Sequence, residues 1–381
     1  MPSPRVIEVS SADPLDRGRQ YGSAAADLIA DAIAYYREGF ARQAGLTWAQ
    51  ALEHGRPWRL LIERDFPELL EEMTGIAEGA GVELAEIVAL NCRGEIIYDN
   101  WFAGVDDAGQ DTPHEPREID GCTSFSLTDD AAGDGHVYAG QNWDWRHAIR
   151  DTVVVLRVVQ PPKPTVIMQL EAGHIGRHGA NSHGIALNAN GLGGRFDDSV
   201  GMPQTVIRRA VLDAANIADA LKTLTWTRAH IPSNALLTHR DGFSIDVETT
   251  PAGHGWEYPD DNGLLVHGNH YQAFVSANPA DQRRPMSPDS LVRVPQARKG
   301  LRKAAQAEKS ADVRTAIHTA MSDHLGHPDS LCAHPDPRLS PIDQWSTTVS
   351  SCVDLTSGDY YLAPGSPCEH PYELVPFNLY E

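Results

Sequence analysis

Gly121 and Cys122 begin a segment in which polar and apolar side chains alternate, "GCTSFSL". The thiolate of a cysteine is a strong nucleophile, and a glycine before it allows backbone conformations that are closed to other residues. The thiol of Cys122 can therefore attack the carbonyl of Gly121 and move that acyl group from nitrogen to sulfur. Hydrolysis of the thioester would free the α-amine of Cys122, with a pKa of roughly 7.7 to 8 in model peptides, to act as the base for its own thiol.

A carboxylate follows Cys122 at about the length of one hairpin. Alternation places Cys122 and Ser124 on one face of a strand, and "DDAAGDG" predicts the turn that follows. The returning strand then brings Asn142 to Asp144 beside Cys122. A thiol and a carboxylate are expected to meet there, although most isolated cysteines and strand-end aspartates are structural.

The elements that position these residues change character near Cys122. The first hundred residues have helical spacing, with Asp13 and Pro14 as a helix start, and Trp101 to Arg117 has the Asp, Gly and Pro content of an exposed linker, about 101–119. After Cys122 the hydrophobic period becomes two. Strands grouped early and late, with helices between them, predict an α+β fold of antiparallel sheets covered by helices, not a doubly wound parallel sheet. The predicted strands are 122–127, 136–144, 152–159, 165–171, 184–189, 235–238, 243–249, 264–268, 346–355 and 360–363.

Composition narrows the classes of function. The chain has 381 residues, 41% of them hydrophobic, and a formal charge of -21 without a basic run. Nucleic acid and anionic membrane surfaces are therefore not expected partners. No stretch reaches the ~18 apolar residues of a membrane helix, and the first residues lack a secretory signal, so we expect a cytoplasmic protein.

The histidines and the remaining cysteines raise the question of a metal. Two histidine pairs have close spacing, but neighbouring glycines argue against a helix at the first pair, and we expect satisfied loop histidines, no metal and no cofactor. The five cysteines are odd in number and lack CxxC spacing, which argues against a disulfide framework or a zinc knuckle. The pairs are His174 with His178 and His267 with His270; His324, His327 and His334 are expected to be solvated, and Cys332, Cys352 and Cys368 to be inert.

Motifs along almost the whole chain resemble one family. They include "RGRQYGSAAADLI", "DGCTSF", "GQNWDW", "EAGHIGRHGANSHGIALNANGL", "VHGNHY" and "STTVSSCVDLTSGDYYL". The chain is similar to the acyl-coenzyme A:6-aminopenicillanic acid acyltransferase (isopenicillin N acyltransferase) family, which consists of self-cleaving N-terminal-nucleophile hydrolases. The resemblance implies a four-layer αββα sandwich and cleavage between Gly121 and Cys122. It also implies a heterodimer of a helical propeptide fragment, 1–121, and a catalytic fragment, 122–381.

The same resemblance suggests roles for single residues. Cys122 matches the nucleophile, Asp144 the aspartate beside the new amine, and Asn269 in "VHGNHY" the asparagine of the oxyanion hole. An asparagine N–H can stabilise a developing oxyanion, although an isolated asparagine is more often a turn former. Four further side chains are candidates for substrate or oxyanion support: Ser124, Asn142, Asn188 and Asn190.

Two departures from the related enzymes bear on the substrate. The penicillin acyltransferase has an arginine-containing stretch where this chain has Asp343 to Trp345, and choloylglycine hydrolases have an arginine at the position of Gln141. The missing cations argue against a β-lactam or bile-acid carboxylate. We expect hydrolysis of a small N-acylated amine through an acyl-enzyme, since no phosphate loop or basic cradle for coenzyme A is evident. The alternatives are acyl-coenzyme A-dependent transfer to an amine, a non-catalytic binding or maturation protein on the same fold, and a zinc hydrolase.

Overall fold

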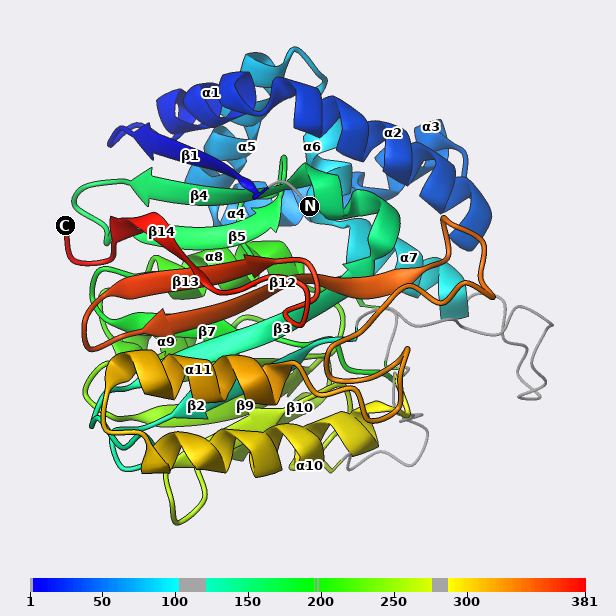
Figure 1. Cartoon of the computed structure of the whole chain (residues 1–381). Coiled ribbons are helices and arrows are strands. Elements are labelled where there is room, and N and C mark those ends of the chain that lie inside the picture. Colours follow the sequence, from blue (N-terminus) through cyan, green and yellow to red (C-terminus); the bar gives the residue numbers. More distant parts are fainter. Residues whose placement is uncertain (1–2, 103–120, 195, 197–198, 276–286) are drawn as a thin grey trace.

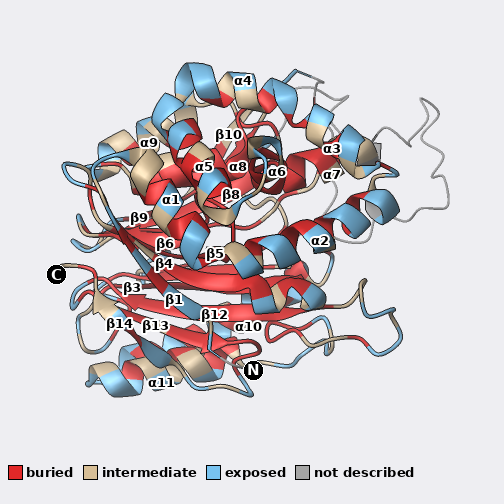
Figure 2. Cartoon of the chain, turned by 90° about the horizontal axis from the view of Figure 1, so that it is seen from above, coloured by how far each residue is buried: buried red, intermediate tan, exposed pale blue. Residues whose placement is uncertain are grey.

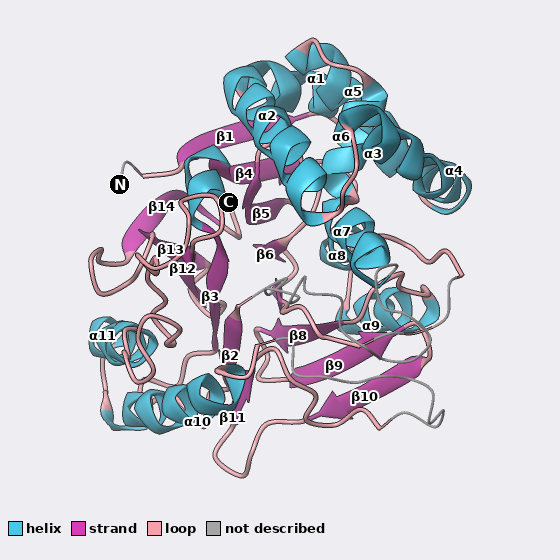
Figure 3. Cartoon of the chain, turned by 90° about the vertical axis from the view of Figure 1, so that its right-hand side faces the viewer, coloured by secondary structure: helices cyan, strands magenta, loops and turns pink. Residues whose placement is uncertain are grey.

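The chain forms two facing β-sheets between two layers of helices (Figure 1, Figure 3). The computed structural model describes residues 3–102, 121–194, 196, 199–275 and 287–381. Within them, one sheet has the strand order β1-β4-β5-β6-β7-β8-β9-β10 and the other the order β11-β2-β3-β12-β13-β14. The predicted αββα sandwich is therefore confirmed.

The larger sheet consists of β1 (Arg5–Ser10), β4 (Val153–Val159), β5 (Val166–Glu171), β6 (His178–Asn181), β7 (Ile185–Asn188), β8 (Ser233–His239), β9 (Ser244–Thr250) and β10 (Gly253–Glu257). The smaller sheet consists of β2 (Thr123–Leu127), β3 (Tyr138–Arg146), β11 (Leu264–His267), β12 (Trp345–Asp354), β13 (Asp359–Pro364) and β14 (Glu373–Asn378).

The helices divide between the two outer layers. Those that cover the larger sheet are α1 (Pro14–Ala24), α2 (Ala26–Gln43), α3 (Trp48–His54), α4 (Arg56–Asp65), α5 (Pro67–Ala80), α6 (Leu84–Asn91), α7 (Arg93–Phe102), α8 (Gln204–Leu212) and α9 (Ile217–Trp226). The smaller sheet is covered by α10 (Ser290–Leu301) and α11 (Ser310–Met321) (Figure 3). Short 3-10 segments span His147–Thr152 and Arg302–Gln306.

The helix starts and stops follow local chemistry. The Asp13 side chain accepts a hydrogen bond from Leu15 N, and Pro14 follows it in the first turn of α1. Gly81, at φ 71°, ends α5 in the left-handed conformation that glycine adopts without strain. The start of α1 agrees with the sequence-based expectation.

The sequence missed four strands, and the first of them matters most. β1 lies in the region expected to be helical, yet it pairs in parallel with β4 from Arg5 opposite Val154 to Ser10 opposite Val159. β6, β10 and β14 are short and contain glycine or proline, which weaken the strand signal. The expected linker at about 101–119 begins inside α7, and its residues from 103 onward lie outside the described ones.

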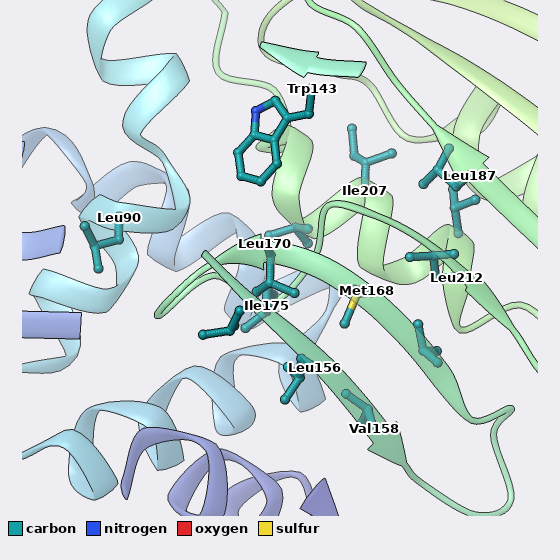
Figure 4. Packing of buried hydrophobic residues seen from close by; sticks show 14 of the residues in the cluster. Leu90, Trp143, Leu156, Val158, Met168, Leu170, Ile175, Leu187, Ile207 and Leu212 are labelled. Carbon is teal, nitrogen blue, oxygen red and sulfur yellow. The ribbon is translucent and has the colours of Figure 1, made fainter. Parts of the chain in front are cut away.

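The residues before Gly121 are part of the main core. Leu90 of α6 belongs to the same buried cluster as Leu170 of β5 and Ile207 of α8 (Figure 4). In Figure 2 the strands are mostly buried, while the outer helix faces are exposed. Buried polar contacts add to this packing, since Glu72 of α5 accepts hydrogen bonds from Arg209 of α8 at 2.7 and 2.9 Å. None of the helices within the described ranges is long and apolar enough to cross a membrane.

Candidate active site

Cys122 immediately precedes β2, on the face that looks toward the larger sheet. The hairpin pairs Thr123 with Asn142, so the end of β3 returns beside Cys122 as expected. The thiol is fully buried, and its sulfur lies 3.8 Å from the carbonyl oxygen of Asp144. The cysteine and the aspartate therefore lie side by side, with the thiol against the backbone carbonyl of Asp144.

The residue before the thiol lies against Asp144. A Cβ atom at Gly121 would lie 3.1 Å from Asp144 Cβ and 3.5 Å from Asp144 Oδ2. The other carboxylate oxygen, Oδ1, accepts a hydrogen bond of 2.6 Å from the hydroxyl of Thr347 on β12. Thr347 thus orients the carboxylate so that Oδ2 faces the Gly121–Cys122 junction, where cleavage would release an amine.

Asn269 is brought to the same place by Arg293, which sequence reasoning missed. One nitrogen of the Arg293 guanidinium donates to the carbonyl of Cys122 at 2.7 Å, and the other donates to Asn269 Oδ1 at 2.8 Å. Asn269 Nδ2 is then the donor end, and it gives one N–H to the carbonyl of Gly191 at 3.0 Å. Because an amide nitrogen has two N–H groups, Asn269 has the capacity for a second acceptor.

Arg293 itself is almost completely buried, at 1% exposure, on the inner side of α10. Burial lowers its pKa, but the carboxylates of Asp289 and Asp144 outweigh that effect and raise the pKa above its usual value. The guanidinium is therefore a permanent positive charge beside the thiol. An arginine with helical spacing in "SLVRVPQARK" offered only a weak signal for this, because the same pattern describes a solvated helix face.

The two candidate asparagines near β7 differ in position. The side chain of Asn190 donates to the hydroxyl of Ser124 at 2.9 Å and to the carbonyl of His267 at 3.2 Å. Asn190 and Ser124 therefore connect the two sheets on the face of Cys122. Asn188 ends β7 opposite Leu236 and is buried.

Asn142 lies on the other face of β3. Its amide nitrogen donates to the carbonyls of Met321 and Leu331, at 2.9 and 2.8 Å. These contacts hold the segment after α11 against the sheet. Asn142 is thus placed to support the loop behind Asp144 and lies on the opposite face of β3 from the thiol.

A buried ion pair fixes the strand that leads to Asn269. His267 Nε2 lies 2.8 Å from Glu248 Oε1 and 3.7 Å from Asp246 Oδ1. Burial lowers the pKa of His267, but the two carboxylates outweigh it and raise the pKa to about 9, so the ring is charged at neutral pH. Burial also raises the pKa of Asp246, to about 6.

Comparison with known proteins decides the family. The model of the acyl-coenzyme A:6-aminopenicillanic acid acyl-transferase family matches residues 131–334. The 40 kDa form of acyl-coenzyme A:6-aminopenicillanic-acid-acyltransferase from Emericella nidulans is 30% identical over 281 residues, which cover 74% of this chain and 72% of the relative. The chain belongs to this acyltransferase family. The expectation of an enzyme that handles acyl groups is thereby supported.

Two solved structures are also similar. A variant of the conjugated bile acid hydrolase from Clostridium perfringens is 13% identical with a TM-score of 0.43, covering 68% of this chain and 94% of that one. Penicillin V acylase from Agrobacterium tumefaciens is 14% identical with a TM-score of 0.35, covering 64% and 83%.

A small pocket adjoins the site in this acyltransferase family member. Gly191, whose carbonyl accepts from Asn269, lines it, as does Trp145 next to Asp144. Three guanidinium groups and one carboxylate line it as well: Arg93, Arg177, Arg208 and Glu95. The sequence-based argument against an anionic substrate concerned Asp343 to Trp345 and Gln141. The arginine side chains that line the pocket come from other positions of the chain.

The side chain of Gln141 bonds to the backbone of Ala189. Its side chain donates to the carbonyl of Ala189 at 2.9 Å and accepts from the N–H of the same residue at 3.1 Å. This reciprocal pair links β3 to the residue after β7. Gln141 therefore joins the two sheets beneath the site.

Some of the histidines and cysteines that are far apart in the sequence lie close together in the structure. His178 lies in β6, and His267 is ion-paired at the end of β11. In contrast, the ligand atoms of His324, Cys332, His334 and Cys368 lie within 4.8 Å of one another. Sequence spacing gave no sign of this convergence, because Cys368 comes 34 residues after His334.

Proposed function

We propose that the protein is a self-cleaving cysteine amidohydrolase of the N-terminal-nucleophile type, acting on the amide bond of a small N-acylated compound. One observation carries the proposal. The Arg293 guanidinium bridges the carbonyl of Cys122 and the side chain of Asn269, while Asp144 lies against Gly121. A nucleophile, an oxyanion donor and a group that can orient an α-amine are thus gathered around one residue.

Maturation would proceed by attack of the Cys122 sulfur on the Gly121 carbonyl carbon. The C–S bond forms and the Gly121–Cys122 C–N bond breaks, and the leaving nitrogen takes up the proton lost by the thiol. Water then hydrolyses the thioester to give a carboxylate on Gly121, a thiol and a free amine on Cys122. Asp144 Oδ2, which faces this junction, is placed to hold that amine.

In the mature enzyme the same sulfur would attack the substrate carbonyl. The α-amine accepts the thiol proton and later gives it to the leaving amine. The second N–H of Asn269 stabilises the oxyanion, and Arg293 keeps the donor end of the amide pointed correctly by occupying Oδ1. Water releases the acyl group from the acyl-enzyme in hydrolysis, whereas an amine takes it in acyl transfer.

The charge of the pocket lining favours a substrate with an anionic group near the scissile amide. Arg177 and Arg208 bring positive charge to its lining besides Arg93, whose guanidinium is paired with the buried carboxylate of Glu171. Burial raises the pKa of Glu95, which weakens the opposing charge. Transfer from acyl-coenzyme A is the alternative reaction, because the related curated enzyme is named for it.

The two fragments are proposed to remain one particle. β1 of the first fragment adds a strand to the sheet of the second, and Glu171 of β5 is buried between Tyr36 and Arg93 of the first fragment, with Tyr36 Oη 2.6 Å away. Separation of the fragments would leave buried charges without their partners and would expose apolar surface to water.

Acyl-amide profiling of the purified protein tests the proposal. Matched N-acyl substrates, with and without a carboxylate on the amine side, are incubated with and without acyl-coenzyme A. We expect hydrolysis that favours the anionic substrate and requires Cys122. Turnover only when acyl-coenzyme A is present would establish the transferase. A chain that stays uncleaved, turns over no substrate and is unaffected by thiol alkylation in its binding would establish a non-catalytic protein.

A further inference from the structure

We propose that His324, Cys332, His334 and Cys368 form a structural zinc site behind the active site. Two imidazole nitrogens and two thiol sulfurs converge there, with all four ligand atoms within 4.8 Å of one another. Two thiolates with two imidazoles, in a tetrahedral arrangement, are a donor set typical of structural Zn²⁺. The site goes beyond the proposed amidase function and does not depend on it.

The three separations from His334 agree with a tetrahedron around one ion. His334 Nε2 lies 3.1 Å from His324 Nε2, 3.6 Å from Cys332 Sγ and 3.3 Å from Cys368 Sγ. Zn–N bonds of about 2.0–2.1 Å and Zn–S bonds of about 2.3 Å separate tetrahedral ligand atoms by roughly 3.3–3.8 Å. These three separations therefore lie within a few tenths of an ångström of those that a bound zinc ion requires.

Hydrogen bonding alone explains this cluster poorly. His334 Nε2 is surrounded by three donor-or-acceptor atoms, but a ring nitrogen carries at most one proton and can make at most one such bond as a donor. A metal ion satisfies all four atoms together, because each contributes a lone pair once both thiols have lost their protons. The other ring nitrogen of His334, Nδ1, lies 3.6 Å from the carboxylate of Glu369, an arrangement common for metal-bound histidines.

The backbone around the cluster is already held in place. Cys332 N donates to Asp323 O at 3.0 Å, and His334 N donates to Pro328 O at 3.0 Å. Ser366 Oγ donates to Ala333 O at 2.9 Å, which brings the segment that carries Cys368 against the loop. Cys332 is buried while Cys368 and His324 are exposed, so an ion can reach the site from solvent.

The site is linked to Asp144 through Ala333 and Thr347. Ala333, between two of the ligands, donates its N–H to Thr347 Oγ1 at 3.0 Å. Since that oxygen accepts from Ala333, its own proton points to Asp144 Oδ1, 2.6 Å away. A bound ion would thus fix Ala333, whose N–H orients the Thr347 hydroxyl toward Asp144. With all four positions taken by protein ligands, the ion has no open position for substrate, unlike a catalytic zinc.

Zinc titration of the full chain, reduced and freed of metal by a chelator, tests the site. Against a chromophoric competitor we expect one equivalent of Zn²⁺ per chain, and Co²⁺ should give the absorption bands of tetrahedral thiolate coordination. Cys368→Ser and His324→Ala change exposed ligands, and each should weaken binding by about 10²-fold or more. His54→Ala, at an exposed histidine of α3, is the matched control and should retain one equivalent.

Three results would overturn the zinc site. These are a reduced wild-type chain that binds no stoichiometric Zn²⁺, a Cys368→Ser variant that binds as tightly as wild type, and a Cys332–Cys368 disulfide in metal-free protein purified without oxidant. Cys122→Ala separates this proposal from the amidase, because all four ligands lie in residues 324–368. That variant should bind one equivalent whether or not the chain cleaves itself.

Discussion

Arg293→Lys should impair catalysis by disturbing Asn269. Lysine keeps the positive charge, but its single ammonium group cannot reproduce the guanidinium fork that reaches both Cys122 O and Asn269 Oδ1. Without the donor on Oδ1, the Asn269 amide loses one of its two anchors and keeps the bond to Gly191 O, so its second N–H no longer points reliably toward the oxyanion. Arg293 thereby acts on the reaction through Asn269.

The magnitude follows from the bonds that are lost. A hydrogen bond to a charged group contributes about 1.5–3 kcal/mol, and removal of one oxyanion donor typically lowers kcat by about 10²–10³. We therefore expect Arg293→Lys to lower kcat by roughly 10² and Asn269→Ala by roughly 10²–10³. Because both substitutions remove the same donor, the double variant should lose about 10³ rather than the product of about 10⁴–10⁵.

The assay is kcat on the best amide substrate for the two single variants and the double variant, each on matured protein with its thermal midpoint recorded. Arg298→Lys is the matched control on the same helix, since its guanidinium donates to Val266 O and Gln272 Oε1 away from the thiol. It should change kcat less than threefold. Multiplicative losses in the Arg293 and Asn269 pair would refute the idea that Arg293 acts through Asn269.

Three further predictions concern Gly121, the two fragments and His267. Gly121→Ala should slow self-cleavage by roughly tenfold or more, because its Cβ would lie 3.1 Å from Asp144 Cβ; an unchanged rate by mass spectrometry would contradict the tight contact. The two fragments should co-elute in native gel filtration, and separate elution would count against the shared core. The charged state of His267 stabilises the fold fully below about pH 6.5, and this contribution, on the order of 3 kcal/mol, should disappear as pH rises through about 9. Urea unfolding of wild type should show a free energy of unfolding that falls with rising pH over this range, and His267→Gln should lose most of that pH dependence. An equal pH dependence in both proteins would refute the charged state of His267.

The hairpin and the family motifs allowed the sequence to place Cys122 and Asp144 correctly. Local alternation and turn chemistry decide that part of the structure, and the register confirms it. β1 could not be foreseen, because its parallel pairing with β4 joins residues about 150 positions apart, and a six-residue segment carries little periodicity.

The same limit explains Arg293 and the cysteine–histidine cluster. Arg293 is buried only because α10 packs across the start of β2, and nothing in its helical pattern reveals which face that is. Cys368 meets His334 because the loop after β13 folds back on the segment between α11 and β12. Convergence of this kind is a property of tertiary structure, so composition and spacing indicate separate residues.

The most direct test of the central claim is denaturing mass spectrometry of the purified wild-type chain and of Cys122→Ala. Wild type should give two masses, those of residues 1–121 and 122–381, with a free α-amine on Cys122. Cys122→Ala should give one uncleaved mass and no amide turnover. A wild-type chain that remains intact and still hydrolyses its amide substrate would contradict the self-cleaving, N-terminal cysteine mechanism.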